Sequence, residues 1–341
     1  NGSLTISNTQ SRDIQLGTST SSSLSITNNL SISGTSAFVF TAGTGSPDIT
    51  VNGNVTVSGG ELDFCSSGAT GSSTLYVKGN FSHTGGSVTS AGSGRSNALL
   101  INGNSLQTIE SPGFASPNQI AVTIAPTGSG QVEIATAKSF IITSSASFTI
   151  SNTSSATELL VNGTLSTGSS IVNNGAVALN GTLQINASGS VTNNAIVYGA
   201  ASNLIYNSTA SPFNVGAEWT GNSTTAGTGV PQHVTIQNSN VVTMPSSDRG
   251  LAGNLLLTSG GLTLNATSGN LYTGGNWTNN GITFTPNSRK VVINGATAQA
   301  IGGSTATPFY DLEIANTSGG VSLAAPVSVA GNLTLTSGII T

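Results

Sequence analysis

The sequence contains very little charge. Only 5% of its 341 residues are Asp, Glu, Lys or Arg, against roughly 25% in an average soluble domain. The seven basic residues are scattered and provide no basic surface, so we expect no nucleic-acid partner. No apolar run approaches the ~18 residues that a membrane-spanning segment needs, so we expect no membrane insertion.

Cysteine and strong helix formers are also scarce. Cys65 is the single cysteine, which excludes an intramolecular disulfide, and we expect it to be a small buried residue on a strand. Glu, Lys, Arg, Gln and Met are few, and no window keeps apolar residues at a 3.6-residue period. The chain must therefore be stabilised without helices or disulfides.

The residues that are present favour β-strands. Segments such as Leu4-Thr5-Ile6, Val55-Thr56-Val57 and Leu333-Thr334-Leu335 alternate apolar and small polar residues, the period of half-buried strands. Hydrophobic residues make up 36% of the chain and the net charge is only −4, a composition that argues against disorder. The sequence predicts a folded, all-β protein.

A short phrase containing Asn-Gly or Gly-Asn ends successive strand-like segments and recurs every 18–26 residues. Repeats of this length, built from strands, indicate a solenoid in which each repeat is one coil. Glycine and asparagine tolerate positive φ, and stacked asparagines can hydrogen-bond along a solenoid axis. We therefore predict turn and ladder positions at Asn52, Gly53, Asn102, Gly103, Asn162, Gly163, Asn180, Gly181, Asn294 and Gly295.

A longer repeat of nearly 200 residues contains these short ones. Residues 51–64 match 251–264 at an offset of 200, and the offset falls to 196 and then 192 in the next matched segments. In these segments Phe81 aligns with Trp277 and Gln107 aligns with Gln299. We expect two copies, at about 10–200 and 201–341, the second incomplete.

Together these patterns predict a parallel, right-handed β-helix that runs as one continuous solenoid over residues 1–341. The alternative is a series of β-sandwich domains of about 100 residues each. The short return of the strand phrases favours the β-helix, because a Greek key pairs dissimilar strands that lie far apart in sequence.

Candidate sites are few, and the sequence predicts no catalytic residue and no cofactor. Glu61 and Asp63 are candidate calcium or sugar contacts, but their counterparts are Gly261 and Thr263, so we expect a solvated outer face. His83 and His233 lack neighbours at metal-ligand spacing. Arg12-Asp13 and Asp248-Arg249 are predicted to be local surface ion pairs.

The two tryptophans are the remaining candidates. An exposed Trp219 could stack on a sugar ring and is our possible glycan contact, with a core position as the alternative that we favour. Trp277 replaces Phe81 of the first copy, which indicates a core position.

Three phrases carry a resemblance to a known group of proteins: residues 331–338 (GNLTLTSG), 292–302 (VINGATAQAIG) and 309–314 (FYDLEI). They resemble repeats of very large secreted surface proteins of Bacteroidota-type bacteria, similar in style to filamentous-haemagglutinin-like β-helical adhesins. The resemblance implies a secreted structural protein of the cell surface, in an adhesin, extracellular filament or biofilm, without catalysis. Its partners would be copies of itself or adjoining repeats end to end, and surface glycans. The alternative is a carbohydrate-binding or polysaccharide-cleaving β-helix.

Overall fold

The computed structural model describes residues 2–7, 14–17, 19, 21–92, 97–114, 120–144, 146–153, 156–208, 212–238 and 241–341. Arg12 and Asp13 lie outside these residues. The described part of the chain consists of strands, turns and loops, and none of it forms a helix that could cross a membrane. The chain divides into two compact units, unit 1 (Asn1–Val177) and unit 2 (Ala178–Thr341).

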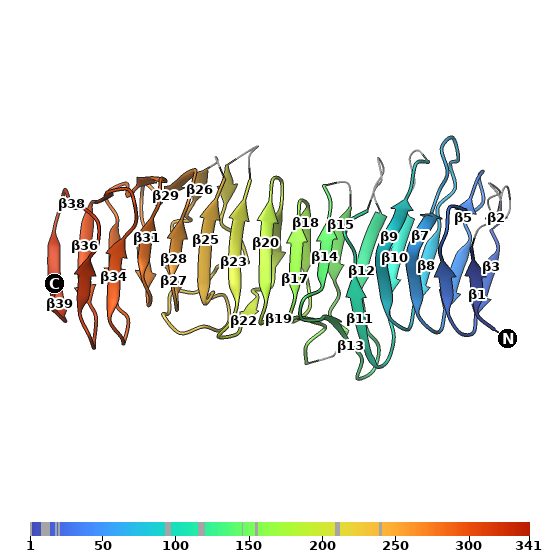
Figure 1. The fold of residues 1–341 in the computed structure, drawn as a ribbon, viewed down its shortest axis with the longest axis horizontal. Helices are drawn as coiled ribbons and strands as arrows, with labels where there is room; N and C mark the ends of the chain where they lie inside the picture. Colours follow the sequence, from blue (N-terminus) through green and yellow to red (C-terminus); the bar gives the residue numbers. More distant parts are fainter. Residues whose placement is uncertain are drawn as a thin grey trace. The chain divides into compact units, whose positions relative to one another are not determined.

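Unit 1 is built from successive coils whose strands lie side by side (Figure 1). One sheet contains β1 (Leu4–Ile6), β4 (Leu30–Ile32), β7 (Val55–Asp63), β9 (Phe81–Thr89), β11 (Leu106–Glu110), β13 (Gln131–Ile134) and β16 (Leu159–Val161), joined by β2 (Ile14–Gly17) and β5 (Ala37–Thr41). A second contains β3 (Ser23–Ile26), β6 (Asp48–Val51), β8 (Thr74–Val77), β10 (Asn97–Ile101), β12 (Ile120–Ile124), β15 (Ser147–Ile150) and β18 (Ser170–Asn173). A third face contains β14 (Ser139–Ile142) and β17 (Thr164–Thr167).

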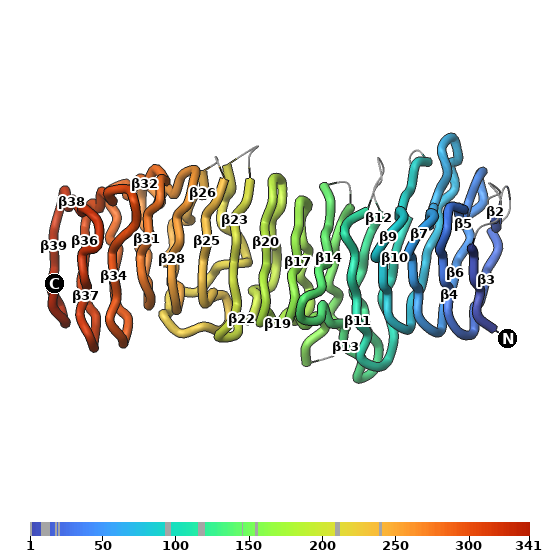
Figure 2. Tube along the Cα trace, viewed as in Figure 1, coloured from blue at the N-terminus to red at the C-terminus, as the bar shows by residue number. Residues whose placement is uncertain are grey.

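Unit 2 is also built from successive coils, as the trace in Figure 2 shows. One sheet contains β20 (Thr182–Asn186), β23 (Asn203–Asn207), β25 (His233–Gln237), β28 (Leu255–Leu257), β31 (Trp277–Asn279), β34 (Gln299–Gly302) and β37 (Val321–Leu323). A second contains β24 (Phe213–Asn214), β26 (Val241–Thr243), β29 (Gly261–Thr263) and β32 (Thr283–Thr285). A third contains β27 (Arg249–Leu251), β30 (Leu271–Thr273), β33 (Lys290–Ile293), β36 (Asp311–Ala315) and β39 (Leu333–Ser337). The remaining strands are β19 (Val177–Leu179), β21 (Ser190–Asn193), β22 (Val197–Tyr198), β35 (Thr307–Phe309) and β38 (Val327–Val329).

The register of the strands places residues of similar character above one another in successive coils. In unit 1, Ile49, Leu75, Leu99 and Val122 occupy equivalent positions of successive strands, and all are buried. The strands are paired in parallel, so each apolar residue lies above its counterpart one coil earlier. The protein is a parallel β-solenoid, as the sequence predicts, and the alternative of tandem sandwiches is wrong because Greek-key sheets are antiparallel. The prediction of one continuous solenoid over 1–341 stays a prediction.

The predicted Asn-Gly positions lie at corners between strands, but the reason for glycine differs from our expectation. Gly53, Gly103, Gly163 and Gly295 do not have positive φ. A Cβ on Gly53 would instead lie 2.6 Å from the backbone oxygen of Asn28, one coil away. Glycine is therefore required at this corner by close contact between coils.

The asparagine ladder runs through the residue that follows this glycine. The Asn29 side-chain oxygen accepts the backbone N–H of Asn54 at 2.8 Å, and the Asn54 oxygen accepts that of Asn80 at 2.8 Å. In unit 2, Asn254 bonds Asn276 in the same way at 2.9 Å. An axial ladder is present, but at this corner it runs through Asn54, two residues beyond the predicted Asn52.

Candidate functional site

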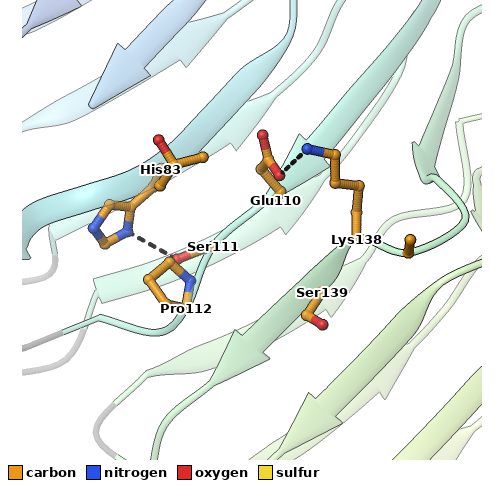
Figure 3. Close-up of a pocket in the computed structure, with 8 residues that line it drawn as sticks. His83, Glu110, Ser111, Pro112, Lys138 and Ser139 are labelled. Atoms are coloured by element: carbon orange, nitrogen blue, oxygen red, sulfur yellow. Dashed lines mark hydrogen bonds and ion pairs between the residues drawn. The ribbon is translucent and has the colours of Figure 1, made fainter. Parts of the chain in front are cut away.

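The described part of unit 1 contains two adjacent surface hollows that share an ion pair. The first, the His83 hollow, has a volume of about 270 Å³ and is lined by residues including His83, Ser111 and Ser139 (Figure 3). The second, the Phe81 hollow, has a volume of about 230 Å³ and includes Ser82 and Thr108 in its lining. Glu110 and Lys138 line both hollows, so this ion pair is the centre of the candidate site.

Three successive coils supply the central groups. Ser82 lies on β9, Glu110 ends β11 directly beside Ser82 in the parallel register, and Lys138 lies in the turn before β14. The Ser82 hydroxyl donates to Glu110 Oε1 at 2.6 Å, and Lys138 Nζ lies 2.8 Å from Glu110 Oε2. Partial burial raises the pKa of Glu110, but the bonds from Lys138 and Ser82 outweigh it and lower this pKa below its ordinary value. Glu110 is therefore ionised at neutral pH.

His83 and Ser111 form the inner side of the His83 hollow. The His83 Nδ1 atom and the Ser111 hydroxyl are 2.9 Å apart, and both side chains are buried. Burial lowers the pKa of His83, so its ring is neutral at pH 7. A backbone hydrogen bond with Gly86 opposes this lowering. Among the described residues, no carboxylate is hydrogen-bonded to the ring, as the base of a serine-nucleophile triad requires.

The lining of the two hollows includes a single carboxylate, that of Glu110. Glycoside hydrolysis uses two carboxyl groups about 5–9.5 Å apart across the scissile bond. The lining of the two hollows therefore does not supply the carboxylate pair of that reaction.

A buried polar cluster lies in unit 2 around Glu218. The Tyr206 hydroxyl donates to Glu218 Oε1 at 2.9 Å, and the Tyr198 hydroxyl donates to the Glu218 backbone oxygen. Burial raises the pKa of Glu218 and lowers that of Arg249, whose positive charge is favoured by Tyr206, Glu218 and Asp248. Arg249 is only 8% exposed, so the predicted surface pair with Asp248 is wrong. Its guanidinium donates to the Asp248 backbone oxygen instead.

Trp219 is fully buried, which confirms the core position that the sequence favours. The possible glycan contact is wrong, because no ring face is accessible to a sugar. Its Nε1 donates to the backbone oxygen of Gly250 at 2.7 Å. Trp277 is also fully buried and packs against Phe284 and Phe309, so its predicted core position is confirmed.

Glu61 and Asp63 do not form the outer face that we expected. Asp63 is buried, and its Oδ1 accepts the Cys65 N–H at 3.0 Å. Glu61 Oε1 accepts the hydroxyl of Thr89 at 2.5 Å. Among the described residues, no group of three or more His, Cys, Asp or Glu could hold a metal ion. Cys65 is buried, as predicted, but it lies in the bend after β7 and not on a strand. Burial raises the pKa of its thiol.

Sequence reasoning missed Glu110 and Lys138 as partners. A signal was available, since Ser82, Glu110 and Lys138 follow one another at intervals of 28 residues, close to one coil. The sequence places no metal-ligand partner near His233. In the structure His233 takes the place of asparagine in the axial ladder, and its Nδ1 accepts the Asn254 N–H at 3.0 Å. Comparisons with protein families, with curated proteins and with solved structures found no match to this chain.

Proposed function

We propose that this chain is a structural and adhesive segment of a secreted bacterial surface fibre or giant adhesin, and that it acts without catalysis. The observation that carries the proposal is the in-register stacking of coils, reinforced by axial ladders such as Asn29, Asn54 and Asn80. Such a ladder resists separation of the coils along the axis, because many hydrogen bonds must break together. The repeat style of residues 292–302 and 331–338 supports secretion and display on the cell surface.

We propose that its partners are copies of itself or adjoining repeats, stacked end to end. The parallel register supports this, because successive coils pair in the same way, as Leu312 and Ile314 of β36 do with Leu333 and Leu335 of β39. The same backbone pairing can be repeated between one copy and the next.

Negative-stain electron microscopy of the purified chain at increasing concentration tests the proposal. We expect thin fibres of uniform width whose length grows with concentration. Dispersed monomers at every concentration, or monomers that depolymerise a polysaccharide, would overturn the proposal.

A further inference from the structure

The solenoid framework does not require the Glu110–Lys138 ion pair. In the long repeat, residue 110 corresponds to residue 302, which is glycine. The register is the same in both copies, since Glu110 lies beside Ser82 and Gly302 lies beside Thr278. The framework therefore accommodates a residue without a side chain at this place, and the carboxylate is particular to the first copy.

Both members of the Glu110–Lys138 ion pair can form hydrogen bonds to a ligand. Glu110 is ionised and offers acceptor oxygens toward both hollows, while the Lys138 ammonium carries three donors. The side chains of Glu110 and Lys138 remain 20% and 51% exposed, so both can exchange water for a ligand. Adjacent donor and acceptor groups match neighbouring hydroxyls, each of which both donates and accepts.

Hydroxyl-bearing side chains surround the Glu110–Lys138 ion pair. Ser82 and Thr108 add hydroxyls on the Phe81 hollow, and Ser139 adds one on the His83 hollow. Phe81 and Ile109 lie beneath the Phe81 hollow but are buried, so the contacts that this hollow offers a sugar are polar. Each hollow is smaller than the ~300 Å³ lower bound for typical ligand pockets, which fits one small ring in each.

We propose that the groove formed by the Phe81 and His83 hollows binds a neutral disaccharide unit of a surface glycan, with Glu110 and Lys138 hydrogen-bonded to its hydroxyls. The opposite charges of the pair cancel, and the whole chain carries a net charge of −4, so an acidic sugar gains little. This inference rests on the proposed adhesive function and names its ligand class. Binding is weak at a single groove and gains strength when many chains are displayed together.

Saturation-transfer NMR with the intact chain and cellobiose tests this inference, with digalacturonate as the acidic comparison. We expect cellobiose signals that fall at least about tenfold in Glu110→Gln and Lys138→Met variants, because hydrogen bonds to charged groups are lost. Lys290→Met and Glu313→Gln are the matched controls, because these residues form an ion pair of the same 2.8 Å length in unit 2. Circular dichroism verifies that each variant keeps its β-structure.

Three results would overturn the inference: no cellobiose binding by the unaltered chain, an unchanged signal in the groove variants, or binding of digalacturonate alone. The outcome is separable from that of the fibre proposal. Fibres formed by a chain that fails to bind cellobiose would leave the structural role intact and reject the groove. Cellobiose binding without fibres would retain the groove and reject end-to-end assembly.

Discussion

The side-chain oxygen of Asn54 accepts the backbone N–H of Asn80, its counterpart one coil later, at 2.8 Å. Asn54 also donates its own backbone N–H to the side chain of Asn29, one coil earlier. One residue type at one corner thus links three coils. These bonds supplement the strand pairing along the same axis and use neither charge nor cysteine.

The ladder predicts a difference between two asparagines at the same corner. Asn54→Ala should lower the free energy of unfolding by about 1 kcal/mol, since it leaves the Asn80 N–H without its acceptor. Asn52→Ala should change it by less than ~0.5 kcal/mol, because that exposed side chain makes no hydrogen bond to another described residue. Urea unfolding measures both values, and equal effects would contradict the assignment of the ladder to Asn54.

Gln107 and Gln299 occupy equivalent places in the two copies of the long repeat, so replacing either one should lower the free energy of unfolding by a similar amount. Gln107 accepts the Gly103 N–H at 2.6 Å and donates to the Val77 and Gly79 backbone oxygens. Gln299 accepts the Gly295 N–H at 2.7 Å and donates to the Thr273 and Gly275 backbone oxygens.

Replacing either glutamine with Ala should therefore cost about 2–4 kcal/mol in urea unfolding, because the three hydrogen bonds that they share are lost at a buried corner. Gln299 also loses the bond that it accepts from the Asn316 side chain at 2.9 Å, so its loss should lie toward the upper end of this range. Gln15→Ala is the control, because Gln15 is exposed and should have little effect. A large loss in one copy and none in the other would refute the structural equivalence.

Close contact between coils predicts intolerance of a methyl group at Gly53. The Gly53→Ala variant should be destabilised by about 1–3 kcal/mol, because its Cβ would lie 2.6 Å from the Asn28 backbone oxygen. Gly2→Ala serves as the comparison, since a Cβ there meets nothing within 4 Å. Thermal unfolding midpoints of the two variants decide the matter, and a Gly53→Ala protein as stable as the parent would show that the corner can relax.

Glu218 predicts a pH dependence of stability. Its pKa is raised above the ordinary 4.5, so the folded chain binds this proton more tightly than the unfolded chain does. The resulting stabilisation is fully present below pH 4.5 and is lost as the pH rises through the raised folded-state pKa. Glu218→Gln should remove this decrease in stability with rising pH, because the amide does not ionise. The variant should therefore gain stability relative to the parent chain at neutral pH.

Glu313 provides the control of opposite sign. Lys290 and Thr336 lower the pKa of Glu313, so its contribution is present above the ordinary 4.5 and is lost as the pH falls through the lowered value. Urea midpoints between pH 3 and 8 for the parent, Glu218→Gln and Glu313→Gln separate the two effects. Identical pH profiles for the parent and Glu218→Gln would show that Glu218 does not titrate differently on folding.

Short-range patterns were sufficient to predict much of this structure. Alternation at Val55-Thr56-Val57 predicts a strand, and the alignment of Phe81 with Trp277 predicts a shared core position, which burial confirms. These predictions succeed because the period of the side chains and their bulk are local properties of the chain.

The sequence by itself determined the all-β class, the parallel coil and the corner positions, because a repeat shorter than 30 residues without charge can bury its apolar faces only by stacking. Only the tertiary structure decided which side chains meet across coils. The burial of Trp219, the pairing of Glu110 with Lys138 and the placing of the ladder at Asn54 depend on register and loop length. A shift of one residue turns a side chain from the surface to the core, and composition carries no information about that shift.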